Sequence, residues 1–254
     1  MAHQFRLLET GYNKAYYNMA LDQAILEQVA AGTVPPTLRL YGWKPAAISV
    51  GYFQGMDEEV DLAACREYGI DYVRRITGGG AVFHQSEVTY SIVLPLDHPL
   101  ADQAILASYG RLCQGIVAGL EILGVKARFA PINDIVVEGK KISGNAQTRK
   151  LGCILQHGTI LLNVDVDLMF TLLKVPSEKA KGKLIADVKE RVTSLQAVLG
   201  RSVTFEETAA ALVRGFTQAL DLDLAAQQVS ATEESRAREL IHSRFADPAW
   251  NMKR

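Results

Sequence analysis

The segment RRITGGGAVFH, at residues 74–84, is the stretch of this 254-residue chain that looks least like ordinary scaffold. Its three consecutive glycines permit positive φ angles and let backbone N–H groups approach a ligand closely. Arg74 and Arg75 supply bidentate donors for a phosphate or a carboxylate. The segment has neither the G-x-G-x-x-G spacing of a dinucleotide-binding turn nor the G-K-[ST] of a P-loop. Taken alone, it is either a ligand-binding loop or a tight hairpin that carries surface arginines.

Strands and helices are expected on both sides of this segment. Apolar spacing predicts strands over 37–41, 47–52, 71–76, 87–94, 127–129, 134–137, 141–147 and 153–163. Helical spacing predicts helices over 16–31, 60–68, 101–123, 167–173, 193–199, 205–220 and 231–245. We therefore expect an α+β fold, in which a mixed β-sheet is flanked by helices and the C-terminal third is helical.

Composition and charge exclude several classes of protein. Hydrophobic residues make up 48% and charged residues 22% of the chain, which is typical of a globular protein. The net charge of −1 gives no support for a nucleic-acid partner. Three cysteines without a C-x-x-C pair argue against disulfides and a zinc ribbon and favour a reducing compartment. With no signal peptide and no apolar run of membrane-spanning length, we expect a cytoplasmic protein without a membrane partner.

Asn133 and Asp134 stand at the head of the apolar strand expected over 134–137. A carboxylate in this place could hold Mg²⁺ through oxygen, while the amide binds a neighbouring polar group of a ligand. The pair is also typical of a turn or a helix cap, so the residues alone leave both interpretations open.

The segment EGKKISGNAQ, at residues 138–147, predicts a hairpin turn and a returning strand. Alternation places Lys141, Ser143 and Asn145 on one face of that strand. The small residues Gly144 and Ala146 leave space for a bound molecule or for close backbone packing. A fixed positive charge in a cleft and a solvated edge hairpin both agree with this pattern.

A single histidine and the three cysteines complete the candidates. His157 lies in an otherwise apolar strand, where a hydrogen-bonded core residue is one interpretation, and no second histidine at ligand spacing supports a metal site. Cys113 falls on the apolar face of the expected long helix, and nothing near Cys65 or Cys153 marks either as an activated nucleophile.

Together, these segments resemble the lipoate–protein ligases of the biotin/lipoate protein ligase superfamily. The resemblance is carried, in the family's order, by RRITGGGAVFH at 74–84, ND at 133–134, GKKISGNA at 139–146 and HGTILL at 157–162. Supporting segments are NMALD at 18–22, GYFQ at 51–54 and WN at 250–251, so the resemblance spans nearly the whole chain.

The resemblance implies an α+β fold around an acyl-adenylate cleft and an ATP-dependent reaction. Ligases of this family activate lipoate with ATP and Mg²⁺ to lipoyl-AMP and pyrophosphate. They then pass the acyl group to a lysine of a lipoyl domain of a 2-oxoacid dehydrogenase complex, or of the glycine-cleavage H protein.

The resemblance also implies roles for residues of this sequence. Lys141 would be the catalytic cation that meets the α-phosphate and the acyl carbonyl in a desolvated cleft. Asp134 would hold Mg²⁺, and Asn133 the nucleotide. Thr77 and His84 would contact the activated carboxyl group. The other residues implied in substrate and nucleotide binding are Arg74, Arg75, Gly78, Gly79, Gly80, Val82, Phe83, Ser143, Gly144, Ala146, His157, Gly158 and Thr159.

The alternative is an octanoyl or lipoyl transferase of the same superfamily. These enzymes use no ATP and form a thioester on a cysteine. The two positions at which the resemblance places that cysteine hold Lys126 and the segment Val175-Pro176-Ser177. Neither position is a cysteine, and Asn133-Asp134 is the pair typical of the ligases, so both observations favour the ligase. The segment QSEVTY at 85–90, in contrast, is more similar to the transferases.

The chain ends at Arg254, soon after the WN pair, where many ligases continue into a small accessory domain. We therefore expect residues 1–254 to form a single catalytic domain, whose accessory function is dispensable or supplied by a separate ligase subunit. A non-catalytic binder of lipoyl domains would have lost the strand lysine or the glycines, and both are present.

Overall fold

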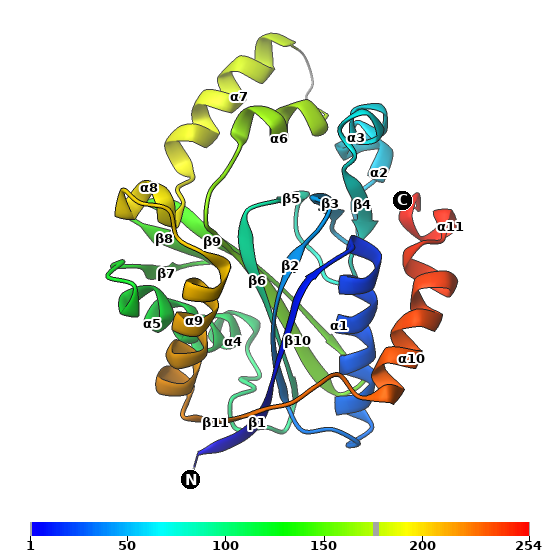
Figure 1. The fold of residues 1–254 in the computed structure, drawn as a ribbon, viewed down its shortest axis with the longest axis vertical. Helices are drawn as coiled ribbons and strands as arrows, with labels where there is room; N and C mark the ends of the chain where they lie inside the picture. Colours follow the sequence, from blue (N-terminus) through cyan, green and yellow to red (C-terminus); the bar gives the residue numbers. More distant parts are fainter. Residues whose placement is uncertain (1, 175–177, 254) are drawn as a thin grey trace.

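A mixed eight-stranded sheet forms the centre of the protein in the computed structural model, which describes residues 2–174 and 178–253 (Figure 1). Its strands, in spatial order, are β11 (Leu222–Ala226), β1 (His3–Asn13), β2 (Thr37–Trp43), β6 (Glu87–Pro95), β10 (Cys153–Leu161), β9 (Lys140–Lys150), β8 (Asp134–Val137) and β7 (Arg128–Ala130). Strand β1 is parallel to both of its neighbours, and the other pairs are antiparallel. A second sheet contains β4 (Asp71–Arg74), β3 (Ala47–Val50) and β5 (Val82–His84).

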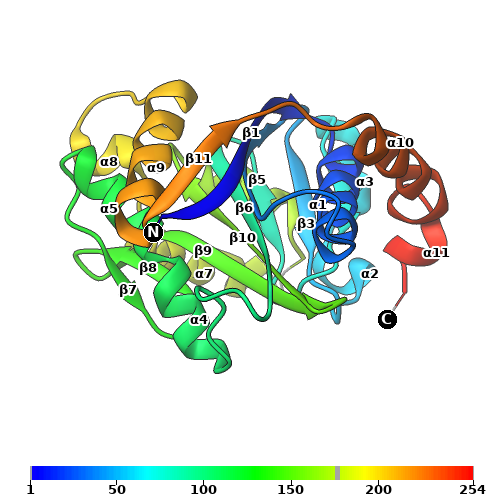
Figure 2. The ribbon, with the colours of Figure 1, turned by 90° about the horizontal axis from the view of Figure 1, so that it is seen from below.

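The two faces of the central sheet are covered by different helices, as the view in Figure 2 shows. On one face lie α4 (Ile105–Leu112), α5 (Gln114–Ile122), α8 (Leu195–Leu199) and α9 (Phe205–Leu220). On the other lie α1 (Ala15–Ala30), α10 (Ala231–Leu240), the π-helical turn η1 (Ile241–Phe245) and α11 (Pro248–Asn251). The predicted α+β class is therefore confirmed.

Strand β6 shows how alternation builds these two layers. Val88, Tyr90, Ile92 and Leu94 are buried in the core beneath α5 and α9, as their spacing predicts. Val93 points to the opposite face of the sheet and packs in the core that lies beneath α1. Because β6 lies between β2 and β10, both of its faces are covered.

Helices α5 and α9 approach each other closely because small residues meet at their contact. A Cβ atom added at Gly115 would lie 2.2 Å from the Phe216 ring. The single helix predicted over 101–123 is wrong, since it divides into α4 and α5 at Cys113. There Ile116 N–H donates to the Cys113 carbonyl, three residues back, which tightens the turn.

Several elements were not predicted. They are β1, β5, β11, α2 (Met56–Glu59), α11 and the charged helix α7 (Glu178–Arg191). Figure 1 shows α7 and α6 (Val166–Leu172) projecting together beyond one end of the sheet, near α2 and α3 (Leu62–Tyr68). Val175, Pro176 and Ser177, one of the two positions considered for a transferase cysteine, lie outside the described residues. Within the described part of the chain, no helix has the length and apolar character needed to cross a membrane.

Candidate active site

A cavity of about 340 Å³ lies where the two sheets meet beneath α6 and α7. This volume falls within the range of about 300–1,000 Å³ that small-molecule sites occupy. The predicted site residues that line it are Arg75, Gly79, Gly80, Val82, Phe83, His84, Asn133, Lys141, Gly144, Ala146, His157, Gly158 and Thr159. The predicted residues Arg74, Thr77, Gly78, Asp134 and Ser143 are not among its lining residues.

Arg75 shapes the glycine loop from inside the protein. Its guanidinium donates to the carbonyls of Gly78 (2.9 Å) and Gly80 (2.7 Å) and to the Ser49 hydroxyl (3.0 Å). Burial lowers the pKa of Arg75 to about 10, which still leaves it charged at neutral pH. Its guanidinium therefore places a positive charge in the cavity wall.

The side chain of Arg74 points away from the cavity that Arg75 lines, although the sequence does not distinguish the two arginines. Its side chain is buried and donates to backbone carbonyls of two segments. These acceptors are Gly51, Tyr52 and Gln54 before the site, and Trp250, Asn251 and Lys253 at the C-terminal end. Arg74 thus joins two parts of the chain instead of facing the cavity.

Lys141 extends along β9 toward the cavity and is held by Asp134. Its Nζ lies 2.7 Å from Asp134 Oδ1, and 42% of its side chain is exposed. The prediction of a desolvated Lys141 is therefore wrong, because the side chain lies at the open part of the cavity. A Cβ atom at residue 144 would come within 2.7 Å of Lys141 Nζ, so Gly144 gives this side chain its path.

A β-bulge changes the predicted alternation of β9. In the pairing with β8, Ile135 faces Ser143 while Val136 faces Lys141, so Ile142 is the extra residue. The prediction that Lys141 and Ser143 share a face is therefore wrong. Ser143 is fully buried instead.

Asn145 and Asn133 fix the polar wall between β8, β9 and β10. The Asn145 amide donates to the Asn133 carbonyl (2.9 Å) and accepts from the Tyr90 hydroxyl (2.7 Å). Asn133 donates its own amide to the Asn145 carbonyl. Asn145 lines the cavity but was not among the predicted site residues, although its place beside Gly144 in the sequence was a usable signal.

His157 is hydrogen-bonded on both ring nitrogens. Nδ1 lies 3.2 Å from Asp22 Oδ2, and Nε2 lies 2.8 Å from the Thr77 hydroxyl. Burial lowers the pKa of His157 despite the nearby carboxylate. Burial would raise the pKa of Asp22, but His157 and Arg39 together hold it below its usual value. His157 therefore lines the cavity as a neutral imidazole. Thr77 does not line the cavity itself, but it is hydrogen-bonded to His157.

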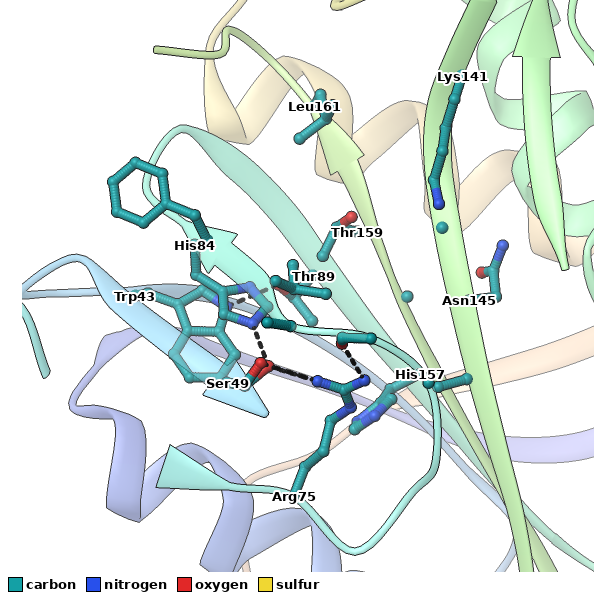
Figure 3. A pocket seen from close by; sticks show the side chains of 18 of the residues that line it. Trp43, Ser49, Arg75, His84, Thr89, Lys141, Asn145, His157, Thr159 and Leu161 are labelled. Atoms are coloured by element: carbon teal, nitrogen blue, oxygen red, sulfur yellow. Dashed lines mark hydrogen bonds between the residues drawn. The ribbon is translucent and has the colours of Figure 1, made fainter. Parts of the chain in front are cut away.

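His84 lies in a second hydrogen-bonded chain, which the sequence did not predict. Its ring stacks on Trp43 with centroids 3.9 Å apart. Nδ1 lies 2.7 Å from Glu87 Oε1, and Nε2 lies 2.8 Å from the Ser49 hydroxyl. Figure 3 shows Trp43, His84, Ser49 and Arg75 gathered on one side of the cavity, across from Lys141 and Asn145 on β9.

The remaining wall is apolar and comes from β10, α6 and α7 and from the segments beside them, of which α7 was not predicted. Its aliphatic side chains are Leu161, Val164, Met169, Val188 and Val192. Val192 also pairs with Lys141 through an isolated bridge, so the segment after α7 is attached to β9 beside the lysine. The cavity thus combines a polar, positively charged part with an apolar part.

None of the three cysteines in the sequence lines the cavity. All three are buried, and burial raises the pKa of Cys113 to about 12 and of Cys65 to about 11. Burial raises the pKa of Cys153 as well. A thiolate nucleophile is therefore not part of this site.

The sequence matches a known family over most of its length. A family model described as the lipoyl protein ligase A/B catalytic domain matches residues 14–217. The chain belongs to the lipoyl protein ligase A/B family. The predicted superfamily is thereby confirmed, and the protein is an enzyme of the lipoate ligase and transferase group.

Similar members of the lipoyl protein ligase A/B family are named octanoyltransferases. Octanoyltransferase LipM of Geobacillus kaustophilus is 37% identical, with 98% of each chain covered. The LipM proteins of Moorella thermoacetica and Bacillus subtilis are 39% and 34% identical, again over at least 98% of each chain.

Solved structures of lipoate–protein ligases have a closely similar fold. The bi-partite lipoate protein ligase of Thermoplasma acidophilum, described with its E2 lipoyl domain, is 35% identical with a TM-score of 0.88. The similarity covers 99% of this chain and 96% of the chain in that structure. A lipoate–protein ligase A bound with ATP is 33% identical with a TM-score of 0.84, and 99% of each chain is covered.

The predicted main activity, ATP-dependent lipoate ligation, is wrong. The finding that overturns it is the naming of full-length relatives as octanoyltransferases, which supports the alternative considered from the sequence. The sequence argument depended on the missing transferase cysteine and on Asn133-Asp134. In the structure both residues interact with β9. Asn133 donates a hydrogen bond to the Asn145 carbonyl, and Asp134 forms an ion pair with Lys141.

Proposed function

We propose that this protein is an octanoyltransferase. It moves a medium-chain acyl group from the thioester of an acyl carrier protein to a lysine of an acceptor protein. The acceptor is a lipoyl domain of a 2-oxoacid dehydrogenase complex or the glycine-cleavage H protein. The observation that carries the proposal is the similarity to octanoyltransferases over at least 98% of each chain.

The composition of the cavity supports an acyl substrate. Met169, Val188 and Val192 provide an apolar wall for an alkyl chain. Burying each methylene group contributes about 0.8 kcal/mol, so a chain of eight carbons has a substantial affinity for such a wall. The acyl carbonyl then lies toward the charged part of the cavity.

Two cations are available to the reacting carbonyl. Attack on a thioester places negative charge on its oxygen, and preorganised donors stabilise that charge. Arg75 is fixed by the glycine loop, and Lys141 is aimed by Asp134. In this proposal Lys141 is the main donor to the oxygen, because its ammonium group keeps hydrogens that Asp134 does not use.

Because no cysteine lines the cavity, the transfer that we propose departs from the cysteine thioester of the superfamily's transferases and proceeds without an acyl-enzyme. The neutral amine of the acceptor lysine attacks the acyl carbonyl directly. The new C–N bond replaces the C–S bond, and the donor leaves as a free thiol.

No Mg²⁺ step enters this mechanism. Asp134, the residue predicted to hold Mg²⁺, has its Oδ1 2.7 Å from Lys141 Nζ. No carboxylate is among the described residues that line the cavity, and no group of three or more candidate ligand residues occurs in the described chain. A divalent cation at Asp134 would lie beside the Lys141 ammonium group, whose charge opposes its binding, so these residues do not fit the ion well.

The test is transfer from octanoyl-acyl carrier protein to an apo lipoyl domain, followed by intact mass. We expect the mass of one octanoyl group to appear on the acceptor lysine in buffer with EDTA and without ATP. Acceptor acylation that requires ATP and free octanoate, with none from the carrier protein, would contradict the proposal.

A further inference from the structure

Glu87 lies beneath the cavity and was not among the predicted site residues. The residue is 2% exposed and is the first residue of β6. Oε1 accepts a hydrogen bond from the Thr89 hydroxyl (2.6 Å) and lies 2.7 Å from His84 Nδ1. Oε2 is buried and has no hydrogen-bond partner among the described residues. A carboxylate buried in this way needs a reason beyond packing, since an unpaired polar atom is costly.

The hydrogen bonds around His84 determine which of its nitrogens carries a proton. An ionised carboxylate only accepts, so in the neutral ring the hydrogen is on Nδ1, facing Glu87. Nε2 then has its lone pair free to accept, and the Ser49 hydroxyl lies 2.8 Å away. Arg75 donates to the same hydroxyl oxygen at 3.0 Å, which directs the hydroxyl hydrogen toward His84.

Stacking on Trp43 holds the ring in this orientation. The two rings are 14° from parallel, and the indole N–H of Trp43 donates to the Thr89 hydroxyl at 2.8 Å. Thr89 in turn donates to Glu87, so the carboxylate and the ring are fixed by one connected network. Ser49 and His84 both line the cavity.

From this geometry we infer that Glu87, His84 and Ser49 form a proton relay for acyl transfer, in which Glu87 is a positioning residue. The inference rests on the proposed transferase function. As the acceptor amine attacks, Ser49 takes the amine proton and passes its own to His84 Nε2. His84 then gives a proton to the sulfur as the C–S bond breaks. Glu87 keeps the ring in the accepting tautomer and stabilises its transient positive charge.

The test compares Glu87→Gln, Ser49→Ala and the wild-type protein in the octanoyl transfer assay. Glutamine keeps the shape and an accepting oxygen but removes the charge. We expect kcat to fall about 10²-fold in both variants, the magnitude typical of acid–base catalysis, with KM for the acyl donor within about twofold. In the ¹⁵N spectrum of the wild-type protein, His84 is expected to be protonated on Nδ1.

Glu233→Gln is the matched control. Glu233 is also a buried glutamate, but it pairs with Arg6 and caps α10 away from the cavity. We expect this control to lower thermal stability and to leave kcat unchanged. An unchanged kcat in either relay variant, or a wild-type His84 protonated on Nε2 alone, would overturn the relay. A wild-type protein that transfers no octanoyl group would instead refute the proposed function itself.

Discussion

At the residue scale, Lys141 is the side chain whose role is easiest to measure. It is partly exposed and ion-paired at the surface of the cavity, so its removal leaves the core intact. We expect Lys141→Ala to lower kcat by about 10²–10³-fold, the loss typical of one donor to a developing oxyanion. Steady-state transfer kinetics measure this effect.

Lys140→Ala provides the comparison for that experiment, since Lys140 is exposed and absent from the cavity lining. It should transfer at the wild-type rate. A Lys141→Ala variant with near wild-type kcat would remove the lysine from the mechanism.

The cysteines allow a second prediction at this scale. Burial raises the pKa of Cys113 to about 12, so it is protonated at neutral pH, and it lies in the core with Leu112 and Ile116. We expect a variant with Cys65, Cys113 and Cys153 all changed to alanine to keep the wild-type kcat/KM. Intact mass of the wild-type enzyme mixed with donor alone should show no acyl adduct. An adduct on a cysteine, or lost activity in a folded cysteine-free variant, would establish a thioester route.

The sequence motifs contain several of the residues that line the cavity. Arg75, His84 and Lys141 belong to contiguous motifs, and the structure places all three on the cavity. The sequence could not distinguish Arg74 from Arg75, because adjacent strand residues point to opposite sides and nothing local shows which side is the cavity. Glu87 could not be connected with His84 either, because their contact depends on how β5 and β6 are placed.

At the scale of elements, Gly158 tests the contact between β9 and β10. A Cβ atom there would lie 2.1 Å from Asn145 Oδ1 and 2.9 Å from the Gly144 carbonyl oxygen. We expect Gly158→Ala to cost about 1–3 kcal/mol in the free energy of unfolding, as overpacking does. Urea denaturation followed by circular dichroism measures this change.

Gly182 in α7 is the matched position, because a Cβ atom there meets nothing within 4 Å. Replacing this helical glycine with alanine should stabilise the protein by about 0.5–1 kcal/mol. Equal effects of the two substitutions would show that the β9–β10 contact is looser than described.

Elements with a regular apolar face were predicted, and those without one were not. Helix α9 was expected over 205–220 and begins and ends at those residues. Helix α7 is rich in charged residues, and its Val188 faces the cavity instead of the core. The apolar residues of α7 therefore do not show the regular spacing of a helix that packs on a core. The bulge at Ile142 was invisible for another reason: it is set by pairing with β8 and not by the sequence of β9.

At the scale of the whole molecule, the buried His157 makes stability depend on pH. Burial lowers its pKa in the folded state, so below pH 6.5 the unfolded chain binds the proton more readily. Stability is therefore full above about pH 6.5 and falls as the pH drops toward the folded pKa, by at most about 1.4 kcal/mol per unit for one histidine. The lowered pKa of Asp22 adds a further loss below its usual value of 3.8.

Urea unfolding at pH 7.5 and pH 5.5 measures this dependence. We expect the difference between the two conditions to be smaller in His157→Gln than in the wild-type protein. The remaining difference should come partly from His98, whose pKa is also lowered by burial. An identical difference in both proteins would show that His157 does not carry the effect.

Arg74 connects the glycine loop with a segment that is remote from it in the sequence. The guanidinium holds carbonyls at 51–54, close to the glycine loop, together with carbonyls at 250–253. The support of the glycine loop therefore depends in part on residues that lie about 176 positions further along the chain. A polypeptide truncated before residue 250 would contain every residue of the cavity and yet leave Arg74 with half of its carbonyl partners missing.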